Sequence, residues 1–184
     1  MAEKLFEAIH LKKYFPTKAG MVHAVDDVSL SIETGNTLGV VGESGCGKST
    51  LGRTILRLQK PTDGKILFHG KDITACSERE FDRIRPKMQI IFQDPYSSLN
   101  PRLTVQELIA EPMLINRTYA THAEVYDRVD ELMDTVGLAQ RLSTAYPHEL
   151  DGGRRQRIGI ARALSLNPEF IVCDEPVSAL DVSI

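Results

Sequence analysis

The sequence predicts an α/β fold that has an antiparallel β layer at its N-terminal end and a helical insertion in its second half. A glycine-rich phosphate-binding pattern occupies residues 42–50, strand-like alternation precedes it over residues 25–32, and the apolar spacing becomes helical over residues 94–150. With 184 residues, of which 42% are hydrophobic and 26% charged, the chain is large enough for one main core.

The elements around the glycine-rich pattern follow from local spacing. Strands are expected at residues 6–11 and 25–32, and the short apolar run at residues 36–41 predicts a buried strand. Apolar residues at helical intervals predict a helix over residues 49–58. Strand, glycine loop and helix therefore follow one another in the order that a phosphate-binding site requires.

The pattern G-x-x-x-x-G-K-[ST] predicts a site for a nucleoside triphosphate. Its glycines allow a tight turn in which consecutive backbone N–H groups converge on phosphates at the start of a helix. Lys48 is expected to reach the β- and γ-phosphates, and the Ser49 hydroxyl is expected to bind Mg²⁺. The expected phosphate-binding residues are Gly42, Glu43, Ser44, Gly45, Cys46, Gly47, Lys48, Ser49 and Thr50.

The rest of the chain divides into further strands and helices. Strands are expected at residues 64–68 and 88–92, with a helix over residues 74–85 between them. A later helix over residues 154–164 leads into a strand at residues 170–173.

The helical insertion carries two start signals. Thr104 and Thr121 are each followed three residues later by Glu, the pattern of a capping box. Gly137 ends the second helix. Its apolar stripe, interpreted as a packing face, consists of Ala123, Val125, Tyr126, Val129, Leu132, Met133 and Val136.

Two carboxylates follow the last predicted strand directly. Charged groups at the end of a buried strand are unfavourable unless they have partners, and a phosphate site supplies them. Asp174 is expected to hold the Mg²⁺ shell, and Glu175 to polarise the attacking water as general base. Gln93, at the end of another strand, could bring an amide to the Mg²⁺ or the water.

A pair of glycines, Gly152 and Gly153, opens the basic helix that follows Asp151. Free N–H groups and the positive end of the helix dipole could bind a second phosphate surface there. In the alternative interpretation, Asp151 is only the N-cap of this helix and the glycines only give flexibility.

Composition narrows the functional classes. The net charge of −3 and the scattered Lys and Arg residues argue against nucleic acid as a partner. No apolar run is long enough for a membrane span and no signal-peptide core follows the N-terminus, so a cytosolic chain is expected unless a partner anchors it. The spacing of the three cysteines predicts reduced thiols.

Together these segments resemble the ATPase subunit of an ABC transporter: residues 42–50, Gln93, residues 151–157, the Asp174-Glu175 pair and residues 178–181. The flanking segments at residues 93–102, 146–150 and 173–184 are similar to the dipeptide/oligopeptide importer branch, especially its second, F-type ATPase subunit, with nickel importers as close relatives. The resemblance implies a P-loop NTPase (RecA-like) core formed by residues 1–93 and 151–184, with residues 94–150 as a helical subdomain.

The same resemblance implies the cofactors, the partners and two more site residues. Two ATPase subunits, in a heterodimer or a homodimer, would enclose ATP and Mg²⁺ between the phosphate loop of one and the Gly-Gly signature of the other. Phe15 is expected to stack on adenine, with Tyr14 as the alternative, and Asp181 to lie at the dimer interface. Two permease subunits and an extracytoplasmic substrate-binding protein complete the expected importer, with this chain peripheral at the cytoplasmic face of the membrane.

Two departures from the family pattern lead to further expectations. Asp151 stands where the signature usually has Ser, and its carboxylate is expected to slow hydrolysis at the shared site. The family's switch histidine has no counterpart in these 184 residues, so a fragment with weak or absent hydrolysis on its own is expected. The alternatives are an ATPase for nickel or another small solute, a soluble non-transport ABC ATPase, and a truncated fragment that cannot hydrolyse ATP.

Overall fold

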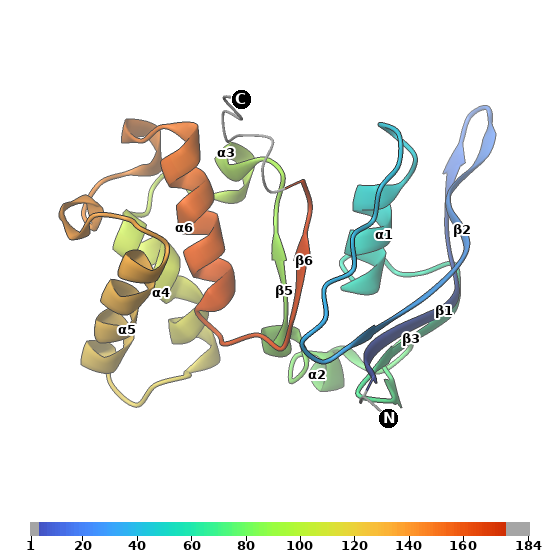
Figure 1. The fold of residues 1–184 in the computed structure, drawn as a ribbon, viewed down its shortest axis with the longest axis horizontal. Coiled ribbons are helices and arrows are strands. Elements are labelled where there is room, and N and C mark those ends of the chain that lie inside the picture. Colours follow the sequence, from blue (N-terminus) through green and yellow to red (C-terminus); the bar gives the residue numbers. More distant parts are fainter. Residues whose placement is uncertain (1–3, 176–184) are drawn as a thin grey trace. The chain divides into compact units, whose positions relative to one another are not determined.

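The computed structural model describes residues 4–175, with the backbone only at Pro95. The chain forms two compact units, Met1–Arg85 and Pro86–Ile184, called unit 1 and unit 2 here (Figure 1). Each unit is described by itself. In the part of the chain that the structure describes, no helix has the length and apolar character needed to cross a bilayer.

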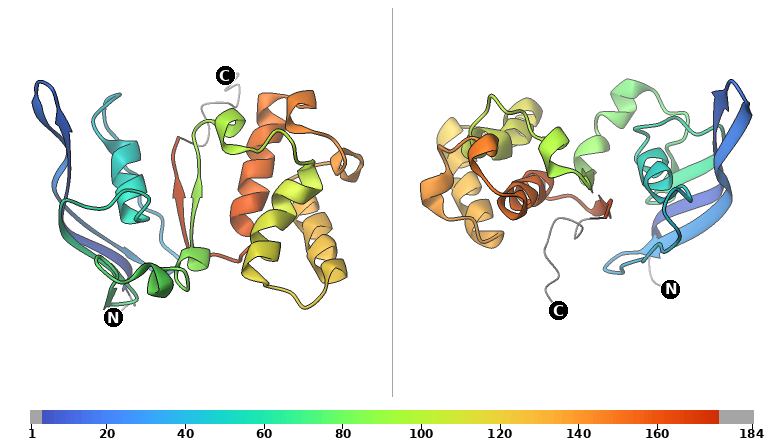
Figure 2. Two further views of the ribbon diagram at one scale, coloured as in Figure 1. Left: turned by 180° about the vertical axis from the view of Figure 1, so that it is seen from behind. Right: turned by 90° about the horizontal axis from the view of Figure 1, so that it is seen from above.

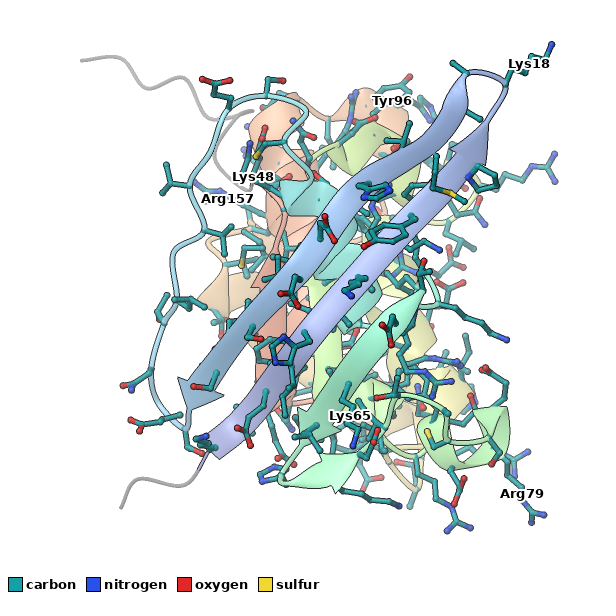
Figure 3. All side chains as sticks on the ribbon, turned by 90° about the vertical axis from the view of Figure 1, so that its right-hand side faces the viewer. Lys18, Lys48, Lys65, Arg79, Tyr96 and Arg157 are labelled. Atoms are coloured by element: carbon teal, nitrogen blue, oxygen red, sulfur yellow. The ribbon has the colours of Figure 1, made fainter. Side chains whose placement is uncertain are left out.

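Unit 1 is built on a four-stranded antiparallel sheet of order β2-β1-β3-β4. Its three long strands confirm the strands predicted at residues 6–11, 25–32 and 64–68, and the first two extend into a long hairpin whose tip carries Lys18 (Figure 3). The strands are β1 (Lys4–Thr17), β2 (Gly20–Glu33), β3 (Asp63–Phe68) and β4 (Lys71–Asp72).

Helix α1 (Lys48–Ile55) packs against β1 and β2, as Figures 1 and 2 show. Leu51 and Ile55 face this contact and are buried, which confirms the helix predicted over residues 49–58 apart from its last turn. Arg57 adopts a left-handed conformation (φ 53°) just after the helix, so the helical path ends there.

The helix predicted over residues 74–85 is wrong in its length. Only α2 (Glu78–Phe81) is helical, followed by a 3₁₀ turn at Arg85–Lys87. Thr74 is held to β3, because its hydroxyl accepts from the Ile66 N–H at 2.7 Å, and Asp72 accepts from the Thr74 N–H at 2.8 Å. These local bonds keep the backbone out of a helix until the capping box at Ser77.

The strand predicted at residues 36–41 is also wrong. This segment has no regular structure, and its apolar side chains face solvent: Leu38 is 46% exposed, Val40 50% and Val41 97%. A strand needs a neighbouring strand for its N–H and C=O groups. Within residues 4–175 no strand pairs with this segment, so its apolar sequence alone does not make it one.

Unit 2 combines a two-stranded parallel sheet with a helical cluster (Figures 1 and 2). Strand β5 (Met88–Ile91) pairs with β6 (Phe170–Cys173) in the register Met88↔Phe170 to Ile91↔Cys173, which confirms both predicted strands. The helices are α3 (Pro95–Ser98), α4 (Val105–Asn116), α5 (His122–Thr135) and α6 (Gly152–Leu164), with 3₁₀ turns at Gln140–Leu142 and Pro147–Glu149.

Helices α4, α5 and α6 enclose one apolar core. The packing face predicted for α5 is confirmed at Val125, Val129, Leu132 and Met133, which are buried, and at Tyr126 and Val136, which pack against the core, but it is wrong at Ala123, which is exposed in the first turn. Both predicted capping boxes are confirmed: the Thr104 N–H donates to Glu107 at 2.7 Å and the Thr121 N–H to Glu124 at 2.9 Å, while each Thr side chain accepts from the backbone of its Glu. The other fully buried members of the core are Val105, Leu108, Ile109, Ala110, Met113, Ile158 and Ala161.

The parallel pairing of β5 and β6 brings their C-terminal ends to the same edge. Gln93 lies just after β5, and Asp174 and Glu175 lie directly after β6. The Asp174 N–H donates to the Ile91 carbonyl at 2.9 Å, so the register continues to the first carboxylate.

Candidate nucleotide-binding site

In the glycine loop of unit 1, Gly47 is the position at which the surrounding backbone leaves least space for a side chain. Gly47 has φ 97°, and a Cβ on it would lie 2.0 Å from the Ala24 carbonyl oxygen in β2. That oxygen belongs to backbone and has no rotamer by which to move away. Gly45 is also left-handed (φ 79°), but a Cβ there would meet nothing within 4 Å. The loop is therefore pressed onto β2 at Gly47, directly before α1 begins.

The Lys48 side chain folds back over the loop (Figure 3). Its ammonium donates to the carbonyl oxygens of Gly42 at 2.9 Å and Glu43 at 2.8 Å, and it lies 4.0 Å from the Cys46 sulfur. The first turn of α1 contains no acidic residue. Backbone N–H groups at the helix start and one ammonium thus make this end of α1 suited to an anion.

The two aromatic candidates for adenine differ in their surroundings. The Tyr14 ring stacks on His23 with 4.0 Å between centroids, and its hydroxyl donates to Asp26 at 2.5 Å. That hydrogen bond raises the pKa of Tyr14 to about 12. Because neighbouring residues of a strand face opposite sides, Phe15 lies on the other face of β1.

Lys13 links Phe15 to another segment of unit 1. The Lys13 ammonium lies 4.8 Å from the centroid of the Phe15 ring and donates to the Lys60 carbonyl at 2.9 Å. Lys60 lies in the segment between α1 and β3, so Lys13 connects Phe15 with that segment. The Phe15 ring is contacted by the Lys13 ammonium, whereas one face of the Tyr14 ring is covered by His23.

In unit 2 the structure brings Gln93 and Glu175 into direct contact. The Gln93 amide donates to a Glu175 carboxylate oxygen at 2.5 Å. Glu175 has φ 47°, a left-handed conformation that is unfavourable for a residue with a side chain. Asp174, the residue before it, is only 7% exposed. The Gln93 carboxamide and the Glu175 carboxylate therefore meet where β5 and β6 end, and Asp174 is the buried residue directly before Glu175.

The start of α6 fits both interpretations of its sequence. Asp151 is the N-cap, since its carboxylate accepts from the Arg154 N–H at 2.8 Å, and the Arg154 guanidinium lies 3.4 Å from the other carboxylate oxygen. The glycines are not required by local packing: a Cβ on Gly152 would meet nothing within 4 Å, and one on Gly153 would lie 3.6 Å from Asp151. Their lack of side chains leaves the backbone of this turn open to a ligand.

Sequence reasoning missed the contact between Arg155 and Tyr96. The Arg155 guanidinium lies 4.5 Å from the centroid of the Tyr96 ring, and its Nε donates to the Pro147 carbonyl at 2.7 Å. No spacing in the sequence signals this contact, because the two residues belong to different elements. Since Tyr96 belongs to α3, the contact joins α6 to the short helix that follows Gln93.

The predicted site residues fall into two groups that belong to different units. Lys48 and Ser49 lie in unit 1, whereas Gln93, Asp174 and Glu175 lie in unit 2. Asp181 lies outside the described residues. Residues 4–175 contain no cluster of three His, Cys, Asp or Glu residues that could hold a metal. A Mg²⁺ ion that keeps its waters and binds phosphate oxygens needs only one or two protein ligands, which the predicted oxygen donors could provide.

Comparisons with known proteins agree with these observations. The family model described as ABC transporter matches residues 25–178. The chain is 57% identical to the oligopeptide transport ATP-binding protein OppF of Bacillus subtilis, in a match that covers 100% of the chain and 61% of that protein. It is 51% identical to OppF of Salmonella typhimurium, over 98% of the chain and 57% of that protein. The chain thus spans about three fifths of the length of these relatives.

The fold is that of ATP-binding cassettes. A dimeric post-hydrolysis state of the cassette MJ0796, bound to ADP and Pi, superposes with a TM-score of 0.89 at 31% identity, over 96% of this chain and 76% of that chain. CbiO1 of Clostridium perfringens, part of the ABC transporter complex cbiONQ, gives a TM-score of 0.80 at 27% identity, over 97% of this chain and 68% of that chain. Because the family model spans most of the chain, from residue 25 to residue 178, the chain belongs to the ABC transporter family.

Proposed function

We propose that this chain is the ATP-binding part of an importer ATPase that couples binding and hydrolysis of ATP to the uptake of di- and oligopeptides. The observation that carries the proposal is the glycine loop, in which Gly47 is held against β2 and Lys48 lies over the loop at the start of α1. The names of the relatives support oligopeptides as the transported class.

The residues of the chain have separate roles in this proposal. Residues 42–50 bind the phosphates, and Lys48 stabilises charge on them. Phe15 stacks on adenine, a role for which it is favoured over Tyr14 because the Tyr14 ring is already stacked on His23. Ser49 provides a hydroxyl for Mg²⁺.

Unit 2 provides the hydrolytic groups. Asp174 and Gln93 offer further oxygens to the Mg²⁺ shell, and Glu175 accepts a proton from the attacking water. When bound, Mg²⁺ would neutralise charge that develops on the phosphates, and Ser49, Gln93 and Asp174 would hold it. In this proposal residues 1–93 and 151–184 form one nucleotide-binding core, and residues 94–150 form the helical subdomain.

A partner subunit completes each site. The open backbone at Gly152 and Gly153 supports a role for the start of α6 toward the nucleotide of a sister ATPase, in a heterodimer or a homodimer. Asp181 would lie at that interface. Two permease subunits and an extracytoplasmic substrate-binding protein complete the importer, which places this chain at the cytoplasmic face of the membrane. The Asp151 carboxylate, which Arg154 partly neutralises, slows hydrolysis at the shared site.

Calorimetric titration of the 184-residue chain with Mg²⁺ and ATP tests the binding step. We expect saturable binding by the unmodified chain and a loss of at least about tenfold in affinity for Lys48→Ala, because that ammonium carries the charge at the loop. Lys65→Ala is the matched control, since Lys65 is an exposed lysine on β3 of the same unit (Figure 3). No binding by the unmodified chain, or equal affinity for the two variants, would refute the proposal.

Hydrolysis is tested separately, in the assembly with a sister ATPase. Glu175→Gln is expected to remove turnover and leave ATP binding intact, because a carboxamide keeps the shape of the side chain but is not a base. Binding without turnover by the unmodified chain in that assembly would support the alternative of a fragment that cannot hydrolyse ATP.

A further inference from the structure

The contact between Gln93 and Glu175 depends on a loop that has little support of its own. Gln93 is exposed and lies between the end of β5 and the single turn of α3. Asp94 caps that turn: its carboxylate accepts from the Tyr96 N–H at 2.8 Å, and this hydrogen bond lowers the pKa of Asp94. The direction of the Gln93 side chain is therefore linked to the position of α3.

Helix α6 holds α3 at both ends. At one end the Arg155 guanidinium lies on the Tyr96 ring at 4.5 Å. At the other end the Arg162 guanidinium donates to the Ser98 carbonyl at 2.9 Å and lies 3.4 Å from Glu111 of α4. The two arginines are seven residues apart, so they lie on the same face of α6.

Arg155 is itself fixed by a second contact. Its Nε donates to the Pro147 carbonyl at 2.7 Å, so the planar guanidinium cannot swing freely away from Tyr96. Tyr96 is 65% exposed and thus gains little from burial. The cation–π contact with Arg155 therefore positions its ring.

We propose that Arg155 is a positioning residue that holds Gln93 against Glu175 through Tyr96 and the Asp94 cap of α3. Arg155 lies three residues after Gly152, at the start of α6. On the proposed function, that end of α6 serves the site of the sister subunit, whereas Gln93 and Glu175 serve the site of this chain. The contacts that run from Arg155 through Tyr96 to Gln93, all within unit 2, would then link the nucleotide site of the sister subunit with the nucleotide site of this chain.

Nuclear magnetic resonance of the ¹⁵N-labelled chain tests the link without any nucleotide. The side-chain amide signals of Gln93 are identified by their loss in Gln93→Ala. We expect Arg155→Ala and Tyr96→Leu to shift these signals toward the position of a solvated amide, because the hydrogen bond to Glu175 is weakened. Tyr96→Phe keeps an aromatic ring for the cation–π contact and is expected to leave the signals in place.

Arg154→Ala is the matched control, because Arg154 is the neighbouring arginine of α6 but pairs with Asp151. Methyl signals of the buried Val129 report whether each variant keeps the helical core. Unchanged Gln93 signals in Arg155→Ala, with the core intact, would overturn the proposal. So would an equal shift in Arg154→Ala.

A second measurement addresses the catalytic consequence in the assembly with a sister ATPase. Arg155→Ala is expected to lower kcat on the order of tenfold with little change in the calorimetric affinity for ATP, because Gln93 no longer holds Glu175 in place, whereas the phosphate loop is unaffected. Tyr96→Phe should keep the turnover of the unmodified chain. A lower affinity with unchanged kcat would contradict a positioning role. If the unmodified assembly does not turn over, the proposed hydrolysis fails, and the spectra still decide the link between Arg155 and Gln93.

Discussion

The helical core of unit 2 and the phosphate loop of unit 1 are stabilised in opposite ways. In the core, Val105, Leu108, Ile109 and Val129 have no exposed surface, and capping boxes satisfy the starts of α4 and α5. In the loop segment, residues 36–45 are all exposed. The loop is held by the hydrogen bonds of Lys48 to the Gly42 and Glu43 carbonyls and by the close approach of Gly47 to Ala24.

This difference teaches where stability and binding reside in the chain. Buried apolar area and local hydrogen bonds make the helical core resistant to opening, whereas a segment with little buried area opens at low free energy. A loop that must surround phosphates uses its N–H groups for the ligand and not for neighbouring backbone. Mutations in the core should therefore change stability, and mutations in the loop should mainly change nucleotide affinity.

The largest expected effect is a loss of stability from Leu132→Ala in α5. Leu132 is 1% exposed in the centre of the helical core, and removing a buried leucine side chain typically lowers the free energy of unfolding by about 2–5 kcal/mol. Urea unfolding followed by circular dichroism measures it. Ile115→Ala, at a residue of α4 that is 73% exposed, is the control and should change stability by less than about 0.5 kcal/mol. Equal effects of the two variants would contradict the assignment of this core.

A smaller effect on stability, joined to a loss of ATP binding, is expected for Gly47→Ala. A left-handed φ of 97° and a Cβ 2.0 Å from the Ala24 oxygen together force the loop off β2, at a cost on the order of 1–3 kcal/mol. Gly45→Ala is the matched control, since it shares the left-handed backbone but has open space around its Cβ. Calorimetry should show a much greater loss of affinity for Gly47→Ala, and the comparison fails if the two variants lose affinity equally.

The same contrast explains how far the sequence predicts the structure. The helices were predictable because their caps, apolar stripes and end signals all lie within one segment, as at Thr121 and Gly137. The absence of a strand at residues 36–41 was not predictable from the sequence. A strand needs a neighbouring strand to pair with, and its own residues do not specify that neighbour. The helix expected over residues 74–85 was shortened by a tertiary contact, the bond of Thr74 to β3.

The candidate site also contains features that local sequence patterns predict and features that depend on tertiary packing. Motif spacing selected the loop residues, Gln93 and the two carboxylates as candidates, but the contact of Gln93 with Glu175 follows from the parallel pairing of β5 and β6. The spacing did not predict the contact of Arg155 with Tyr96, which exists only once α6 packs on α3. The roles of these residues toward ATP stay predictions until binding is measured.

The smallest expected effect concerns the capping box of α4. Thr104→Ala removes the hydroxyl that accepts from the Glu107 N–H, which should lower the free energy of unfolding by about 1 kcal/mol. Urea unfolding at pH 7 measures it, and Thr135→Ala is the control: that Thr side chain, at the end of α5, donates to a carbonyl within its own helix. A loss as large in the control would show that the cap is not the cause.

The same cap gives a pH dependence of known sign. Hydrogen bonds from the Thr104 backbone N–H and then from its hydroxyl lower the pKa of Glu107 in the folded chain. A lowered folded pKa means that the unfolded chain binds the proton more tightly, so the stabilisation is complete above the ordinary Glu pKa of about 4.3 and is lost as the pH falls through the folded value. Glu107→Gln keeps a cap without a titrating group and should flatten the decline of stability below that pH. An unchanged slope would show that the carboxylate of Glu107 does not contribute to the acid sensitivity of the helical core.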